Sequence, residues 1–159
     1  MSRPLRILSI FLRLALGGIF IYAGWIKLRD PWQMFAMAID SYGLLPLKWV
    51  ELTARTLPWA EVALGLWLIV GRWLRIPATL VTALLAVFFA LLVRAYAKGM
   101  EINCGCFGPG EAISWKTLLR DGSMLAGSVL LTVLSFRRPA PAASAPATAE
   151  PVAFLTPQS

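Results

Sequence analysis

The chain has 159 residues, of which 58% are hydrophobic and only 14% are charged, and its formal net charge is +7. Soluble domains average about 25% charged residues, so this composition predicts a membrane protein. The basic residues stand singly or in pairs beside apolar runs, a pattern that excludes the basic stripe of a nucleic-acid-binding protein. With no histidine and two cysteines, histidine-ligated haem and four-cysteine zinc or iron–sulfur sites are excluded, and we assign no metal ligands.

Four apolar segments are expected to cross the membrane. The first, residues 7–26, is long enough for a hydrocarbon core of roughly 30 Å, and no cleavage motif follows it, which favours a retained helix over a signal peptide. The other spans are expected at 52–71, 77–96 and 117–136, the second passing through Pro58 with a kink. The predicted fold is therefore an all-α membrane protein, a four-transmembrane-helix bundle formed by residues 1–136.

A short interfacial helix is expected between the first two spans. Asp30 is expected to cap this helix, with Pro31 at its first position. Apolar residues recur on one face of it at helical spacing: Trp32, Phe35, Ala36 and Ile39. Such a pattern is typical of an amphipathic helix that lies in the membrane interface, and an ordinary polar connection is the alternative.

The ends of the apolar segments indicate the orientation. The short segments beside one set of ends are dense in arginine, whereas the basic residues on the other side are spread over longer loops. This density favours cytoplasmic termini and places the cysteine loop, residues 97–116, on the extracytoplasmic side. Residues 137–159 are rich in alanine and proline, which predicts a disordered tail.

The cysteine loop holds the only two thiols, Cys104 and Cys106, with Gly105 between them. Cysteines at this spacing can form a disulfide only in a bent, strained ring, which Gly105 tolerates. A three-residue loop yields only about 1.6 kcal/mol of chain-entropy stabilisation. Strained, exposed disulfides are the labile or catalytic ones, so the pair indicates redox chemistry. Binding of a soft metal, Cu(I) or Hg(II), and an inert pair of thiols remain alternatives.

Two charges are expected inside the membrane. Glu61 lies near mid-depth of the second span, where a carboxylate serves as a proton relay, as a hydrogen-bonding group for a quinone, or as a paired charge that holds helices together. Arg13 in the first span is expected either to extend its side chain toward the inner interface or to reach Glu61.

Three further charges are expected at the outer edge, beneath the cysteine loop: Arg94, Arg120 and Asp121. A cation beside a thiol favours the reactive thiolate. The alternative is that Arg94 or Arg120 pairs with Asp121 and only anchors the helix ends.

Three stretches of the sequence resemble a known family. The stretches "GGIFIYAGWIKLRDPWQMFAMAIDSYGLLP", "LPWAEVALGLWLIVG" and "INCGCFG" are similar to those of MauE- and DoxX-type membrane proteins. The last of them includes Phe107 and Gly108, which we count as supporting residues of the cysteine loop. The resemblance implies a bundle in the bacterial inner membrane, linked in methylamine-utilising bacteria to disulfide formation in a periplasmic enzyme, with a thioredoxin-like partner.

These observations together predict a membrane thiol–disulfide oxidoreductase component that exchanges electrons with an extracytoplasmic thioredoxin-like partner through Cys104 and Cys106. A single pair of thiols must pass its electrons on, either to a quinone or to another protein, and the opposite direction of flow fits the residues equally well. The residues themselves define no cofactor. The alternatives are a soft-metal (Cu or Hg) binding or transport protein and a non-catalytic membrane anchor subunit.

Overall fold

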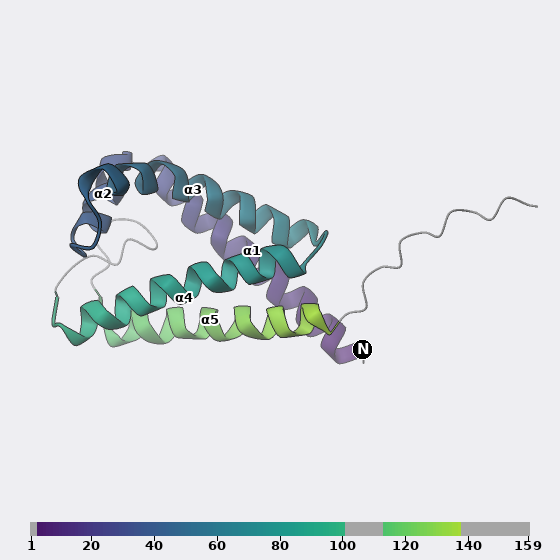
Figure 1. Cartoon of the computed structure of the whole chain (residues 1–159). Coiled ribbons are helices and arrows are strands. Elements are labelled where there is room, and N and C mark those ends of the chain that lie inside the picture. Colours follow the sequence, from purple (N-terminus) through teal and green to yellow (C-terminus); the bar gives the residue numbers. More distant parts are fainter. Residues whose placement is uncertain (1–2, 101–112, 138–159) are drawn as a thin grey trace, which may run out of the picture.

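The computed structural model describes residues 3–100 and 113–137, and this part of the chain consists of five α-helices with no strand (Figure 1). The helices are α1 (Arg3–Arg29), α2 (Trp32–Asp40), α3 (Leu47–Val70), α4 (Arg75–Ala97) and α5 (Trp115–Phe136). The predicted all-helical fold is confirmed. The expected disordered tail lies outside the described residues, apart from Arg137, which caps α5.

Two antiparallel helix pairs make up the bundle. In the first pair, Arg13 of α1 contacts Ile69 of α3, and further along the two helices Lys27 contacts Glu61. In the second pair, α4 and α5 lie side by side (Figure 1). Helix α1 also packs on α5 and so joins the two pairs, while α2 covers part of α3.

The two ends of the bundle differ in what they contain (Figure 1). At one end lie the end of α1, helix α2, the end of α4 and the start of α5; we call it the loop end, because α4 ends and α5 begins there. At the other end Gly71 begins the short turn from α3 to α4, and we call it the turn end. Gly71 has a φ of +72°, which suits glycine, and its backbone N–H donates to the carbonyl of Trp67.

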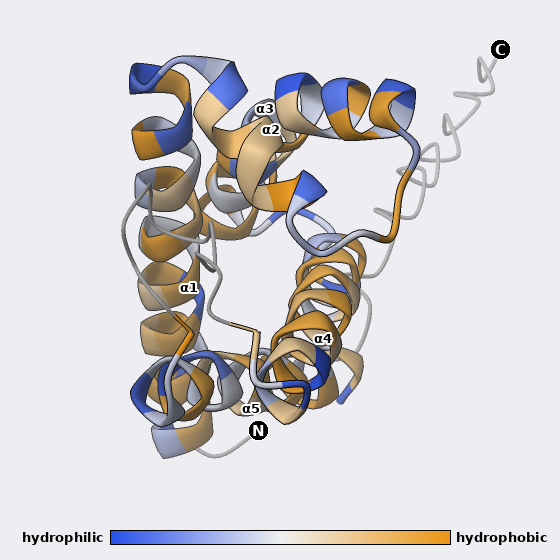
Figure 2. Cartoon of the chain, turned by 90° about the vertical axis from the view of Figure 1, so that its left-hand side faces the viewer, coloured by the Kyte–Doolittle hydropathy of each residue, from blue (hydrophilic) through white to orange (hydrophobic). Residues whose placement is uncertain are grey.

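Three helices in the described ranges, α1, α4 and α5, are long and apolar enough to cross a membrane. Helix α3 has 24 residues but also carries Glu51, Arg55 and Glu61, and it is not one of the three. Large apolar side chains point outward from the bundle, among them Phe11, 67% exposed, and Trp25, 64% exposed. Figure 2 shows the hydrophobic colour along much of α1 and α4. Such outward apolar surface suits a lipid environment.

Two predicted helix boundaries differ from the structure. The helix that contains Pro58 begins at Leu47 rather than near Leu52, because Pro46 takes an extended conformation at its N-cap. Helix α2 begins at Trp32 with Pro31 as its N-cap, so the expectation that Asp30 caps it was wrong. The backbone N–H of Asp30 instead donates to the carbonyl of Ile26 and so prolongs the end of α1.

The apolar face expected in α2 packs inward. Its Phe35 is buried, and the ring lies 5.1 Å from Nζ of Lys27 in α1. At the start of the same helix, the guanidinium of Arg55 in α3 lies 4.3 Å from the ring of Trp32. These cation–π contacts tie α2 to the loop-end parts of α1 and α3.

The interior is divided along the bundle axis. A close-packed core lies toward the turn end and consists of Leu16, Phe20, Leu68, Leu74, Ala78, Val81 and Leu131. The buried charged groups lie toward the loop end, because Lys27 is near the end of α1, Asp121 is near the start of α5, and Glu61 is bonded to Lys27. In the described ranges, buried charge is therefore confined to the loop-end half of the bundle.

Candidate functional site

The predicted cysteine site lies outside the described residues, and this holds for Cys104, Cys106, Gly105, Phe107 and Gly108. The structure does describe the two helix ends to which this segment is joined. Helix α4 ends in a turn at Gly99, whose φ is +64°, and Ser114 caps α5 by accepting a hydrogen bond from the backbone N–H of Thr117. Both helix ends lie at the loop end of the bundle (Figure 1).

A buried ion pair links α1 and α3 near this end. Nζ of Lys27 lies 2.7 Å from Oε1 and 2.8 Å from Oε2 of Glu61, so the ammonium group donates to both carboxylate oxygens. The two side chains are only 3% and 7% exposed. Glu61 thus faces the bundle interior, as its position in the sequence predicted, and its charge is matched where water is scarce.

Small residues bring the two helices close enough to form this pair. The backbone of Gly24 lies against the carbonyl of Pro58, and a Cβ added at Gly24 would come within 2.7 Å of that oxygen. Gly17 and Gly65 pack against each other further along the same interface. Because the backbones approach so closely, Lys27 reaches Glu61 directly across the interface.

Sequence reasoning missed Lys27, which it interpreted only as a topology signal at the end of the first span. A signal was present in the spacing of residues along the first span. Leu16, Phe20 and Ala23 recur three or four positions apart, and Lys27 continues the same stripe; all four are buried in α1. A lysine on such a stripe faces the bundle when the helix extends past it, and α1 continues to Arg29.

Arg13 does not take part in the ion pair. Its guanidinium donates to the backbone carbonyl of Ile69 at 2.9 Å, beside the turn between α3 and α4. Ile69 follows Glu61 by eight residues, or about 12 Å along the helix. Of the two predicted roles for Arg13, contact with Glu61 is therefore wrong, and its side chain instead stabilises the turn end.

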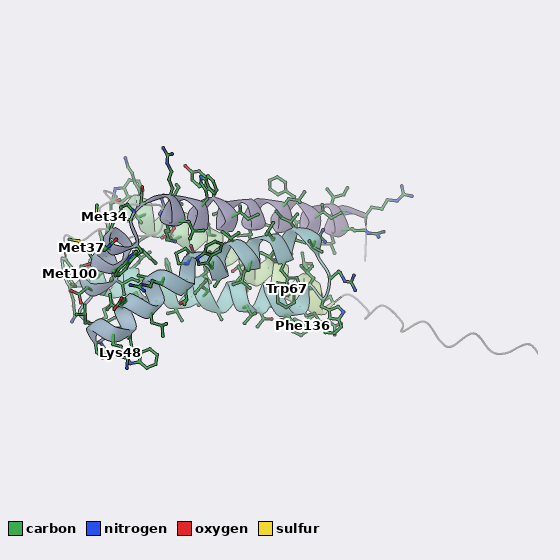
Figure 3. All side chains as sticks on the ribbon, turned by 90° about the horizontal axis from the view of Figure 1, so that it is seen from above. Met34, Met37, Lys48, Trp67, Met100 and Phe136 are labelled. Carbon is green, nitrogen blue, oxygen red and sulfur yellow. The ribbon has the colours of Figure 1, made fainter. Side chains whose placement is uncertain are left out.

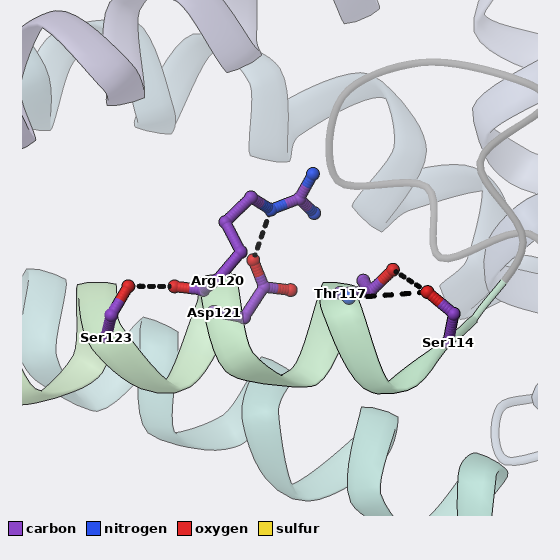
Figure 4. A network of polar contacts seen from close by, with 5 residues as sticks. All are labelled: Ser114, Thr117, Arg120, Asp121 and Ser123. Atoms are coloured by element: carbon purple, nitrogen blue, oxygen red, sulfur yellow. Dashed lines mark hydrogen bonds and ion pairs between the residues drawn. The ribbon is translucent and has the colours of Figure 1, made fainter.

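Of the three charges expected near the outer edge, the structure brings two into contact and leaves the third apart. Nε of Arg120 lies 3.0 Å from Oδ1 of Asp121, and the Asp121 side chain is 9% exposed (Figure 4). Ser123 donates to the backbone carbonyl of Arg120 in the same part of α5. Arg94, by contrast, is exposed in the last turn of α4. The structure therefore brings Arg120 and Asp121 together and leaves Arg94 on the surface.

A cavity lies between α1, α3, α4 and α5 on the loop-end side of the core. It contains about 490 Å³ of empty space, its open side included. Its polar lining comes from the buried pair, Lys27 and Glu61, and from Asp121. The remaining walls are apolar and are formed by Ile19, Phe20, Ala23, Leu84, Leu85, Phe88, Phe89 and Met124. The residues that sequence reasoning picked out separately, Glu61 and Asp121, thus line one space.

Long apolar helices, outward-facing apolar side chains and charges paired inside the bundle define a multi-pass helical membrane protein. The chain belongs to the family of methylamine utilisation protein MauE, whose family model matches residues 5–134. It is 33% identical over 114 residues to the methylamine utilization protein MauE of Paracoccus denitrificans, and the match covers 69% of this chain and 60% of that protein. No solved structure matches it. The MauE resemblance noted in the sequence is therefore confirmed.

Proposed function

We propose that this protein is a membrane thiol–disulfide oxidoreductase component that exchanges electrons with an extracytoplasmic thioredoxin-like partner. The observation that carries the proposal is the Cys-Gly-Cys sequence at Cys104–Cys106, which holds the only thiols of a MauE-family membrane protein. The name of the Paracoccus denitrificans relative connects that protein with methylamine utilisation, and we extend this connection to the present chain as part of the proposal.

The exchange proceeds by two sulfur displacements. A thiolate of the partner attacks one sulfur of the Cys104–Cys106 disulfide and forms a mixed disulfide. The second partner thiolate then displaces the remaining cysteine, so the partner becomes oxidised and both cysteines become reduced. Two electrons and two protons must leave the pair before it can act again, and the reverse sequence carries reducing equivalents outward.

The proposed topology has four spans and cytoplasmic termini in the bacterial inner membrane. Helix α3 serves as the additional span because its 24 residues measure about 36 Å. The charge at its centre, Glu61, is neutralised by Lys27 rather than exposed to lipid. The arginines at the turn end, Arg72 and Arg75, then lie on the cytoplasmic side, and the cysteine segment lies in an oxidising compartment.

One observation favours soft-metal binding as a second candidate function. Met34 and Met37 of α2 lie at the same end of the molecule as Met100, which follows α4 (Figure 3). Thioether and thiolate groups are the ligands that Cu(I) prefers. Three methionines thus lie at the end of the bundle where α4 and α5 are joined in sequence to the segment that carries both cysteines, and this favours a test of Cu(I) binding.

Redox titration of the full-length protein in nanodiscs, followed by thiol alkylation and mass spectrometry, tests the proposal. We expect the Cys104–Cys106 couple to titrate above about −300 mV, the limit below which structural disulfides fall. In Cys104→Ser or Cys106→Ser, exchange with a thioredoxin-like protein should stop, and one of the two variants should trap the mixed disulfide.

A midpoint below about −300 mV, or thiols that never pair under oxidising conditions, would contradict the exchange function. Tight Cu(I) binding that is lost in both serine variants and weakened in Met34→Leu would then support the metal function. Helical content by circular dichroism serves as the control, since neither cysteine variant should alter the fold.

A further inference from the structure

We infer that the cavity between α1, α3, α4 and α5 binds the ring of a membrane-soluble quinone, with Lys27, Glu61 and Asp121 as its polar contacts. This inference rests on the proposed function, because it names the acceptor for the electrons that the cysteine pair collects. The proposed binding site consists only of residues that the structure describes, so the cavity is present whether or not the cysteines react.

The walls of the cavity suit a flat, largely apolar ligand. Three phenylalanine rings, from Phe20, Phe88 and Phe89, line it together with aliphatic side chains. Aromatic rings pack against flat π systems in offset or edge-on arrangements. The empty space of about 490 Å³ includes the open side, so the room for a ring inside the cavity is smaller than this figure. Such mostly apolar walls favour a ring over a chain of water molecules.

The polar groups suit both redox states of a quinone. A quinone carbonyl accepts hydrogen bonds, and the ammonium of Lys27 donates them. A quinol hydroxyl donates hydrogen bonds, and the carboxylates of Glu61 and Asp121 accept them. Lys27 and Glu61 hold each other in place at 2.7 Å, so these two groups are ordered before a ligand enters.

The position of the cavity matches the proposed electron transfer. Asp121 lies six residues into α5, about 9 Å from the start of that helix at Trp115. Phe89 lies eight residues before the end of α4 at Ala97, about 12 Å along that helix. Both of these helix ends are joined to the segment that carries the cysteines, so the cavity lies in the half of the bundle to which that segment is attached.

The reaction balances without a further reactant. The thiols of Cys104 and Cys106 form a disulfide and release two electrons and two protons. The quinone takes up both electrons and both protons and becomes a quinol, which leaves through the membrane. The two protons that the ring oxygens take up equal the two that the thiols release, and the hydroxyl groups of the quinol then donate hydrogen bonds to the carboxylates of Glu61 and Asp121.

Binding is tested with full-length protein in nanodiscs and an azido-ubiquinone photolabel, mapped by peptide mass spectrometry. We expect labelling of peptides from α1 and α4, and its loss by at least tenfold in Leu84→Trp, which fills the cavity. The matched control is Val87→Trp on the same helix, because Val87 is 60% exposed and does not line the cavity. Asp121→Asn, a change of nearly equal size, should reduce labelling severalfold while the protein remains folded.

Four outcomes separate the two proposals. Labelling that persists in a Cys104→Ser/Cys106→Ser variant supports the site independently of thiol chemistry. Labelling at the cavity in a protein whose cysteines never exchange with a partner would contradict the proposed function and leave the quinone site standing. Thiol exchange in a protein that shows no labelling would overturn the quinone site alone. Equal labelling of the Leu84→Trp and Val87→Trp variants would show only partition into lipid and would also overturn it.

Discussion

Lys27 and Glu61 lie 34 positions apart in the sequence, yet their side chains meet at 2.7 Å inside the bundle. Both are nearly inaccessible from outside. The pair joins the loop-end half of α1 to the middle of α3 and forms one wall of the cavity. A buried charge that loses its partner is strongly destabilising, so this relationship makes stability depend on both residues together.

Removing one member of the pair should cost far more than removing both. We expect Lys27→Met or Glu61→Leu alone to lower the free energy of unfolding by about 3–5 kcal/mol, because each leaves an uncompensated buried charge. The double variant should recover most of that loss. Reversible unfolding in mixed micelles measures the difference.

The exposed pair between Glu51 and Arg55 in α3 is the matched control. These side chains are 48% and 55% exposed. Glu51→Gln should therefore change stability by at most about 0.5 kcal/mol. If Lys27→Met lowered the free energy of unfolding by no more than Glu51→Gln does, the buried pair would not hold the helices together.

The glycines of the α1–α3 interface offer a second test. A Cβ at Gly65 would come within 2.7 Å of the backbone oxygen of Gly17, which cannot move aside easily. Gly65→Ala should therefore destabilise the protein by about 1–3 kcal/mol, through overpacking that forces the helices apart. At Gly18, one position along α1 from Gly17, a Cβ would meet no atom within 4 Å.

Gly18→Ala should leave stability unchanged or raise it by up to about 1 kcal/mol, because alanine favours the helix over glycine. Thermal unfolding of both variants in the same detergent provides the comparison. Equal destabilisation by the two substitutions would contradict close helix contact as the reason for the glycine at position 65.

A pair of threonines ties α4 to α5. The hydroxyl groups of Thr82 and Thr132 lie 2.9 Å apart and share a hydrogen bond. In a double-mutant cycle, Thr82→Val and Thr132→Val should show a coupling energy of about 0.6 kcal/mol, the average for such bonds between membrane helices. Thr79→Val is the control: its hydroxyl bonds to the carbonyl of Arg75 in its own helix, so it should show no coupling to Thr132→Val.

The proposed fourth span predicts which positions face opposite sides of the membrane. In a Cys104→Ser/Cys106→Ser background, we expect a membrane-impermeant maleimide to label Lys48→Cys and Lys98→Cys in intact cells, but Arg72→Cys only after lysis. Lys48 and Arg72 lie beyond opposite ends of the apolar part of α3, and both are exposed. Labelling of Arg72→Cys and Lys48→Cys from the same side would show that α3 does not cross.

The helices were predictable because their signals are local. Apolar runs of about 20 residues located α1, α4 and α5, and the apolar face of α2 followed from helical spacing alone. The buried position of Glu61 was also predictable, because a lone carboxylate in an apolar helix has to face the bundle interior. The helix starts near Pro31 and Pro46 were harder, since the proline itself can serve either as the N-cap, as it does in α2 and α3, or as the first helical residue.

The partner of Glu61 was decided only by the tertiary structure. Arg13 and Lys27 lie on the same helix, and composition alone does not distinguish between them. The choice depends on how far α1 is shifted along α3, and the contacts of Gly17 with Gly65 and of Gly24 with Pro58 set that shift. It places Arg13 beside Ile69 and Lys27 beside Glu61. The cavity arises in the same way, because helix packing brings Asp121 of α5 to the space that this ion pair borders.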